Sequence, residues 1–191
     1  MHRFKIALAV IGTGLTLAFS AGAQDLTNAP ATLIENFELQ TGTVMVKAST
    51  PVNSVTVGGG AITINAKEST DVNHGQKLYG ITIGWNGGAN PPAATIPKGY
   101  LVVDYDELDS LINGINYISN ITYEVTSMPT FEVSYTTKSG IRIIAHSDRK
   151  QGGINAYLQL GDWPRIKLNS DQLGQLKTVI VQAKAALDAI K

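Results

Sequence analysis

The sequence predicts an α+β protein in which antiparallel β-sheets are backed by two amphipathic helices. Three observations support this class. Short segments rich in β-branched residues follow one another with turn signals between them, two longer segments repeat apolar residues with a helical period, and each of these follows directly on a strand. The similar order of elements in the two halves suggests two repeats of the ββββα type. We therefore divide the chain into a first strand-rich unit with a closing helix, residues 32–119, and a second unit, residues 120–191, which together form one globular body.

Residues 1–23 have the pattern of an export signal. Arg3 and Lys5 precede an apolar run at residues 6–19, and small residues at 21–23 fit the site that a signal peptidase cleaves. A membrane anchor is the alternative, but the run is shorter than the ~20 residues that a helix needs to span a bilayer. The sequence therefore predicts an exported protein, periplasmic or secreted, with residues 24–31 as a flexible lead-in.

Composition restricts both the partners and the source of stability. The chain contains no cysteine, so an exported product must rely on apolar burial rather than on disulfides. Loss of Arg3 and Lys5 with the leader leaves 13 basic residues against 15 acidic ones, a net charge of −2. So small a charge indicates neither nucleic acid nor an anionic membrane as a partner.

The first unit is expected to contain strands at residues 33–39, 43–48, 54–57, 61–66, 77–85 and 99–103. Pro51 interrupts the strand pattern, and three glycines at 58–60 mark a turn or bulge. The polar residues 68–76 predict a loop. Residues 86–98, with three prolines and two glycines, predict the longest irregular connection.

The first helix follows the strand at 99–103. Asp104 and Glu107 have the spacing of a capping box, with Asp104 as the N-cap. Gly114 weakens the helix interior by up to about 1 kcal/mol relative to Ala, which suggests that another element approaches closely there. The apolar stripe consists of Leu108, Leu111, Ile112, Ile115 and Ile118.

The second unit repeats the scheme with further strands in which apolar residues alternate. Residues 138–140 predict a hairpin loop with Gly140 in a left-handed conformation, and residues 148–153 predict a second turn. The alternation leaves one face of this sheet apolar, so that face must be covered. The expected strands are at residues 121–125, 130–137, 141–147, 154–160 and 165–168.

The closing helix, residues 169–190, is the expected cover of the second sheet. Asn169 and Gln172 form its capping-box pair. An offset of 65 residues places Asp104 of the first helix on Asn169, as an internal duplication would. Any two capped amphipathic helices overlay in this way, so both interpretations stay open. The apolar stripe consists of Leu173, Leu176, Ile180, Ala183, Leu187 and Ile190.

Residues 166–177 (IKLNSDQLGQLK) and the order of four strands and a helix carry a resemblance to known proteins. The second unit resembles the fold of the whirly single-stranded-DNA-binding proteins and of the positive-cofactor transcriptional coactivators. The resemblance implies a curved sheet that grips single strands with basic and aromatic residues. The chain also resembles exported bacterial proteins of unknown function that end in a hairpin and a helix, which implies no activity.

Polar residues that alternate with the apolar ones are predicted to form a partner surface on the other face of the second sheet. Glu132 and Gln159 are expected among the basic and aromatic residues there. Trp85 is a further candidate, because an exposed indole at a strand end can stack on a sugar or a partner. The alternative for Trp85 and Trp163 is a core position at a strand end, and the loop 86–98 is an alternative partner surface. The predicted surface residues are Arg142, His146, Tyr157, Arg165 and Lys167, with Trp85.

The motif search predicts no catalytic residue, cofactor site or metal site. His74 follows Asp71 in a polar loop, where a metal pair or a solvated histidine is possible. His146 and Ser147 supply residue types of a catalytic triad, but neighbouring residues of a strand point to opposite faces. No serine has a G-x-S-x-G context, and the glycine runs lack the spacing of a phosphate loop.

These observations predict an exported, soluble protein with a non-catalytic binding or structural role, whose partner is a protein or a glycan. An exported, hydrolase-like enzyme is the first alternative. Single-stranded nucleic-acid binding is the second, and the net charge of −2 counts against it because phosphate neutralisation supplies much of such affinity.

Overall fold

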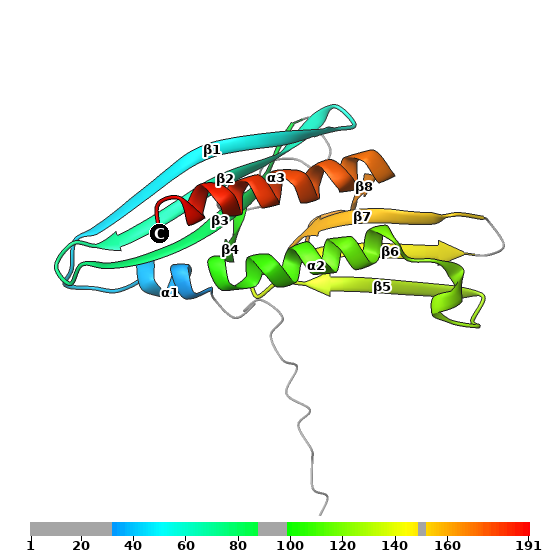
Figure 1. Ribbon diagram of the computed structural model, residues 1–191, viewed down its shortest axis with the longest axis horizontal. Coiled ribbons are helices and arrows are strands. Elements are labelled where there is room, and N and C mark those ends of the chain that lie inside the picture. Colours follow the sequence, from blue (N-terminus) through cyan, green and yellow to red (C-terminus); the bar gives the residue numbers. More distant parts are fainter. Residues whose placement is uncertain (1–31, 88–98, 149–151) are drawn as a thin grey trace, which may run out of the picture.

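The computed structural model describes residues 32–87, 99–148 and 152–191. It contains two four-stranded antiparallel sheets with three helices packed against them, which confirms the predicted α+β class (Figure 1). The first sheet has the order β1 (Met45–Val57), β2 (Gly60–Asp71), β3 (Gln76–Gly87) and β4 (Tyr100–Asp104). The second sheet has the order β5 (Thr130–Thr136), β6 (Ile141–Asp148), β7 (Ile154–Leu160) and β8 (Ile166–Leu168).

The first sheet is longer-stranded than predicted. Gly58 and Gly59 adopt positive φ angles of 46° and 86°, so the predicted glycine turn is confirmed as the β1–β2 connection. Pro51 does not interrupt the strand as predicted; β1 continues through it with a register shift between Pro51 and Asn53. A proline is tolerated there because β1 lies at the edge of the sheet and the irregularity needs no donor. The predicted loop at 68–76 is also shorter, since β2 extends to Asp71.

The predicted strand at 33–39 is wrong, because these residues form helix α1 (Leu33–Glu38). Thr32 and Glu35 form a capping box: Thr32 Oγ1 accepts a hydrogen bond from the Glu35 amide at 3.1 Å, and Glu35 Oε2 accepts one from the Thr32 amide at 3.2 Å. The Thr-x-x-Glu signal was present in the sequence and outweighs the β-branched content. Ile34 and Phe37 are buried by this helix.

The strands of the second sheet agree with the prediction except at its start. Thr137 and Gly140 close the β5–β6 hairpin, with Gly140 at a φ of 84° as expected. The predicted strand at 121–125 is wrong; a 3₁₀ turn, η3 (Tyr123–Val125), follows Thr122, whose hydroxyl accepts a hydrogen bond from the Glu124 amide at 3.4 Å.

The first long helix, α2 (Leu108–Ser119), is preceded by the 3₁₀ turn η2 (Tyr105–Glu107) and lacks the predicted capping box. The Asp104 carboxylate instead accepts hydrogen bonds from the amides of Leu33 (2.7 Å) and Ile34 (3.1 Å), which ties α1 to the end of β4. Glu107 Oε1 accepts one from the Lys138 amide at 2.9 Å. Both carboxylates accept hydrogen bonds from backbone amides that are distant in the sequence, and the local spacing of a capping box does not predict such contacts.

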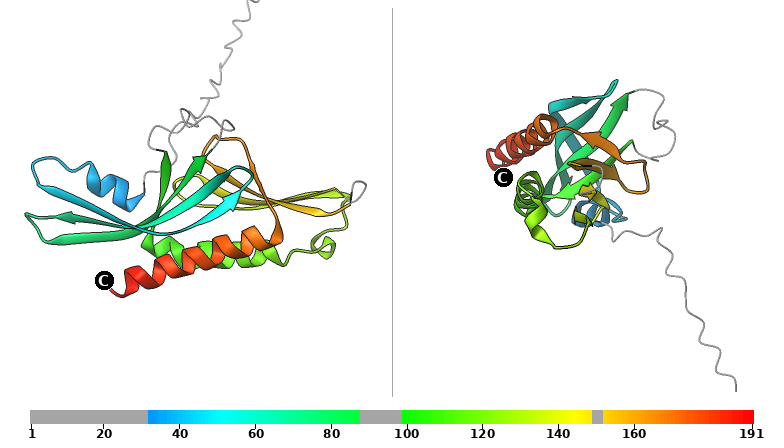
Figure 2. Two further views of the ribbon diagram at one scale, coloured as in Figure 1. Left: turned by 90° about the horizontal axis from the view of Figure 1, so that it is seen from above. Right: turned by 90° about the vertical axis from the view of Figure 1, so that its right-hand side faces the viewer.

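The closing helix, α3 (Ser170–Asp188), has the predicted capping box between Asn169 and Gln172. The prediction that it covers the second sheet is wrong. It lies along β1, β2 and β3 of the first sheet, whereas α2 lies along β5 and β6 of the second (Figures 1 and 2). Gln172 Nε2 donates to the Thr56 carbonyl of β1 at 2.9 Å, and Tyr79 of β3 donates to the Ile190 carbonyl at 3.5 Å. The exchange follows from the position of β8, which contacts β1, so the chain leaves the second sheet beside the first.

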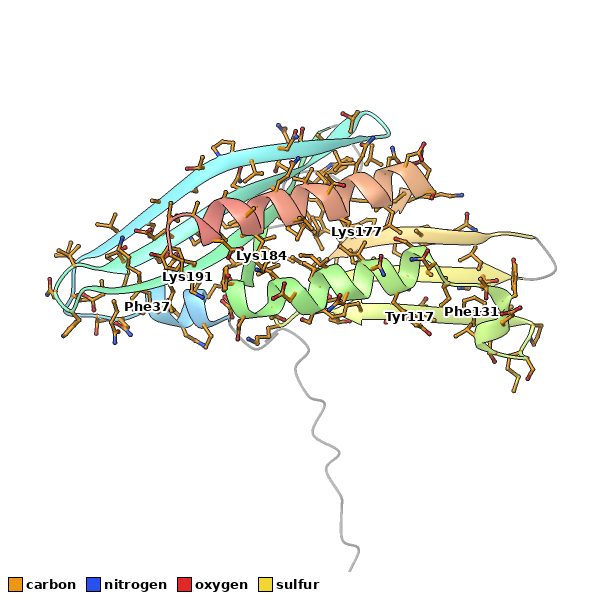
Figure 3. All side chains as sticks on the ribbon, viewed as in Figure 1. Phe37, Tyr117, Phe131, Lys177, Lys184 and Lys191 are labelled. Atoms are coloured by element: carbon orange, nitrogen blue, oxygen red, sulfur yellow. The ribbon has the colours of Figure 1, made fainter. Side chains whose placement is uncertain are left out.

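The two long helices also lie side by side (Figures 1 and 2). Lysines recur along α3 and beyond it at Lys177, Lys184 and Lys191 (Figure 3). Lys177 Nζ donates to Asn116 Oδ1 of α2 at 3.1 Å, and Lys184 Nζ lies 3.8 Å from Asp109 Oδ1 of α2. Beneath them, both sheets and both helices contribute to one buried apolar cluster, in which Leu173, Leu176 and Ile180 are buried as predicted.

An ion cluster anchors α1 to the face of the first sheet opposite α3. Glu38 lies 2.7 Å from Lys67 Nζ and 3.0 Å from Lys47 Nζ, and it accepts a hydrogen bond from Ser69. Burial raises the pKa of Glu38, but hydrogen bonds from Lys67, Ser69 and Lys47 outweigh that effect and lower it from 4.5 to about 2. Lys67 is only 6% exposed, so its ammonium depends on this carboxylate.

Replacement of Gly114 tests the packing of α2 on the second sheet. A Cβ at Gly114 would lie 2.6 Å from two ring carbons of Tyr135 in β5, as the predicted close approach implies. Such overpacking costs about 1–3 kcal/mol, more than the ~1 kcal/mol of helix propensity gained. Gly114→Ala should therefore lower the free energy of unfolding measured in urea. Gly174→Ala in α3 is the matched control, because no atom lies within 4 Å of its Cβ position and the change should stabilise. Equal stability of the two variants would contradict this packing.

Replacement of Glu38 tests the ion cluster. Because its pKa in the folded state lies below the unfolded value, the carboxylate contributes stability above about pH 4.5 and loses it as the pH falls towards 2. Glu38→Gln should lower the free energy of unfolding by about 3 kcal/mol at neutral pH, since Lys67 stays buried without its partner. The variant should also lose less of this free energy than the parent chain as the pH falls from 4.5 towards 2. Glu68→Gln, which weakens the ion pair between Glu68 and the exposed Lys77 (side chains 21% and 47% exposed), should change stability much less. Urea titrations at pH 7 and pH 3 provide the measurement. If the free energy of unfolding of the Glu38→Gln chain fell between pH 7 and pH 3 as much as that of the parent chain, the proposed role of the Glu38 carboxylate would be wrong.

Candidate functional site

The predicted surface residues of the second sheet lie on one face, away from α2. Period-two alternation buries Ile143 and Leu158 towards the core and places the polar side chains opposite. Strand register brings Tyr157 opposite Lys167 and His146 opposite Glu132. We call this surface the outer face of the second sheet; it carries Glu132, Arg142, His146, Tyr157, Arg165 and Lys167.

Glu132 connects two of the basic residues on this face. Its Oε2 lies 2.9 Å from Arg165 Nη1, and its Oε1 lies 3.5 Å from Arg142 Nη2. The three side chains are 35–38% exposed. Ion pairs at such exposure contribute little stability, so the main effect of Glu132 is to hold both guanidinium groups over the sheet. It balances only one of their two charges.

Lys167 differs from the other cations of this face. It is exposed, and within the described part of the chain no carboxylate pairs with it. Its partner on the neighbouring strand β7 is Tyr157, whose side chain is half-buried. The outer face therefore offers one unpaired ammonium beside an aromatic ring and two guanidinium groups that share a single carboxylate.

Trp85 does not lie on this face but borders it through a groove of about 340 Å³. The groove lies where the β1–β2 turn, the end of β3 and the segment entering β8 meet, and it is lined by Trp85, Arg165 and Lys167 together with Val57, Gly58, Pro164 and Ile166. The half-buried indole rests against Gly60, where an added Cβ would lie 2.4 Å from ring atom Cζ2. We call this feature the Trp85 groove. Three of the six predicted surface residues thus come together, although they derive from different sheets.

The two histidines that were considered as catalytic or metal-binding residues, His146 and His74, do not form a catalytic arrangement with the neighbours considered for them. His146 is exposed and Ser147 is fully buried, which confirms that they occupy opposite faces. His74 Nδ1 lies 2.6 Å from Asp71 Oδ2, but His74 is in the β2–β3 turn with 70% of its side chain exposed. Asp71 also accepts hydrogen bonds from Thr43 and from the amides of Asn73 and His74, and the Thr43 hydroxyl leads the contacts that lower the pKa of Asp71 to about 2. This carboxylate is committed to closing the turn.

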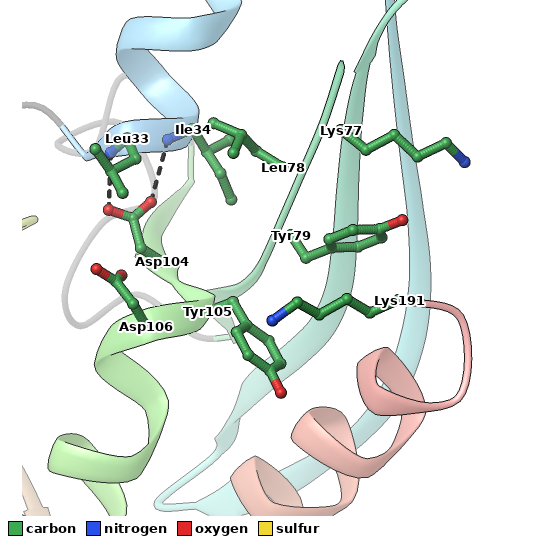
Figure 4. Close-up of a pocket in the computed structure, with 9 residues that line it drawn as sticks. All are labelled: Leu33, Ile34, Lys77, Leu78, Tyr79, Asp104, Tyr105, Asp106 and Lys191. Atoms are coloured by element: carbon green, nitrogen blue, oxygen red, sulfur yellow. Dashed lines mark hydrogen bonds between the residues drawn. The ribbon is translucent and has the colours of Figure 1, made fainter. Parts of the chain in front are cut away.

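A second cavity, of about 230 Å³, lies where α1, β3, η2 and the end of α3 meet (Figure 4). Tyr79 and Tyr105 line it with Leu33 and Leu78, and Lys191 Nζ lies 3.9 Å from the centre of the Tyr105 ring. The Tyr105 hydroxyl is hydrogen-bonded to Asp188, which raises the pKa of Tyr105. The buried Asp104 also lines this cavity, and its carboxylate accepts hydrogen bonds from the amides of Leu33 and Ile34 in α1. Sequence reasoning missed this cavity because its walls come from segments far apart in the chain.

Comparison with known proteins gives no relative: no family model, no curated protein and no solved structure matches the chain. Within residues 32–87, 99–148 and 152–191, no group of three histidine, cysteine or acidic residues is placed to hold a metal ion. Among the described helices, none has the length and apolar character needed to cross a membrane. The resemblance to the whirly and coactivator fold stays a prediction from residues 166–177 and the order of elements.

Proposed function

We propose that the chain is a non-catalytic binding protein, exported after removal of residues 1–23, and that its partner binds to the outer face of the second sheet. The observation that carries this proposal is that Arg142, Arg165 and Lys167 lie on one sheet face, where Glu132 is the one carboxylate whose side chain the structure describes and pairs with Arg142 and Arg165. Basic and aromatic side chains held by a rigid sheet form a preorganised surface, which lowers the entropic cost of binding.

The charge on this face favours an acidic partner. Among the side chains that the structure describes on this face, three cations and one carboxylate leave an excess of two positive charges, although the exported chain carries a net charge of −2. A local positive surface on an otherwise acidic chain attracts anionic groups. The alternative of an enzyme is favoured only by the His74–Asp71 pair, and no described group is hydrogen-bonded to His74 Nε2.

Single-stranded nucleic acid is the second candidate partner, because each four-stranded sheet is followed by a helix as the resemblance of the second unit implies. Such binding relies on several phosphate contacts. The shared carboxylate of Glu132 leaves few free cations for a row of phosphates, which favours a partner with fewer or more widely spaced anionic groups.

Charge reversal on the outer face tests the proposal. The exported chain is titrated with polyglutamate, polygalacturonate and oligothymidylate as acidic probes, and with dextran as a neutral one. Arg142→Glu should weaken binding of the preferred acidic probe by about tenfold or more, since a charge-assisted contact is replaced by repulsion. Added salt should weaken it further.

Lys177→Glu is the matched control, because it changes the charge equally on the helix side of the molecule (Figure 3). It should leave binding unchanged. Equal binding by the Arg142→Glu and Lys177→Glu chains, or no binding of any acidic probe, would reject the proposed surface. Preference for oligothymidylate would favour the nucleic-acid alternative.

A further inference from the structure

We infer that the Trp85 groove is a subsite for one acidic sugar unit of a glycan. The inference rests on the proposed function, because the groove continues the outer face of the second sheet through Arg165 and Lys167. It goes further by naming the chemistry of the ligand: a ring with a flat apolar face that carries a carboxylate.

The indole of Trp85 can contact a ligand only through its ring surface. Its Nε1–H already donates to the Gly87 carbonyl at 3.0 Å, so it has no hydrogen available for a ligand acceptor. Its benzo edge is supported by Gly60, where a Cβ would collide with the ring. With its Nε1–H already bonded, the half-buried indole presents only its apolar, polarisable ring surface, to which the C–H face of a sugar ring is complementary.

The segment that enters β8 provides the charge of the groove. Lys167 has no carboxylate partner among the described residues, and Arg165 is held in place through Nη1 by Glu132. An anionic group in the groove would meet an unpaired ammonium and a guanidinium whose position is already fixed. Complementary charge beside a stacking surface is the combination that selects an acidic sugar over a neutral one.

A sugar acid fits these contacts better than a nucleotide strand or an acidic peptide. The described residues that line the groove include a single indole and one unpaired cation, whereas a strand stacks successive bases and neutralises successive phosphates. An acidic peptide side chain would use the cations but would leave the indole without a flat partner. The volume of about 340 Å³ lies at the lower end of the range of small-ligand sites.

Tryptophan fluorescence of a Trp163→Phe chain tests this inference, because Trp85 is then the only indole of the two in the sequence. Trp163 is 4% exposed, and its Nε1 lacks a hydrogen-bond partner among the described residues, so phenylalanine removes no hydrogen bond there. The probe is a short oligogalacturonate, and its methyl ester is the control ligand, with the same rings and no charge. The acid should change the Trp85 emission on binding, and the ester should bind at least about tenfold more weakly.

Two variants locate the subsite. Lys167→Gln removes the ammonium from an exposed position, and Gly60→Ala displaces the indole without removing it. Each should weaken oligogalacturonate binding by about tenfold, whereas Lys177→Gln should not change it. Calorimetry on the same chains gives a readout that does not depend on the fluorophore, and circular dichroism confirms that the Gly60→Ala chain is folded.

The outcomes separate the two proposals. Equal binding of acid and ester, or oligogalacturonate binding that is insensitive to both Lys167→Gln and Gly60→Ala, would overturn the sugar subsite. If polyglutamate or oligothymidylate then still bound in an Arg142-dependent way, the proposed function would stand without it. Oligogalacturonate binding that depends on Lys167 and Gly60 but not on Arg142 would support the subsite and reject the wider surface.

Discussion

The structure depends on the burial of two apolar helix stripes against sheets that belong to the other half of the chain. The helix that follows the first sheet covers the second, and the helix that follows the second covers the first (Figure 2). With no cysteine in the chain, this burial has to hold the two halves together. Neither sheet can keep its inner face dry without the other half, so the exchange of helices makes the two sheets interdependent.

The same exchange determines which surfaces remain available for binding. Both long helices lie on one side of the molecule, so the polar faces of both sheets are directed away from them. On the first sheet, α1 covers part of that face and is fixed there by Glu38 and Asp104. The second sheet retains its basic and aromatic outer face. The Trp85 groove forms because β8 contacts β1, which is also the point at which α3 crosses to the first sheet.

The sequence was informative where the physical signal is local. Alternation predicted which residues share the outer face of the second sheet, Asn169 and Gln172 predicted the start of α3, and Gly114 predicted a close approach that Tyr135 provides. Non-local interactions escaped prediction. Asp104 and Glu107 have capping-box spacing but bind α1 and Lys138, and an apolar stripe shows that a helix is buried without showing which sheet buries it. Trp85 and Lys167 line the same groove only because of how the two sheets are placed relative to each other. The ion pairs of Glu132 with Arg142 and Arg165 depend on side-chain conformations across several strands.

The exchange of helices is tested most directly by nuclear Overhauser effects between protons of packed residues in the folded chain. Leu187 near the end of α3 lines a shallow surface pocket together with Ala66 of β2, in the first sheet. The account predicts a cross-peak between the Leu187 and Ala66 methyls and another between Gly114 Hα of α2 and the Tyr135 ring of β5. Cross-peaks from Leu187 to the inner residues of the second sheet, such as Ile143 or Leu158, in place of Ala66 would contradict it.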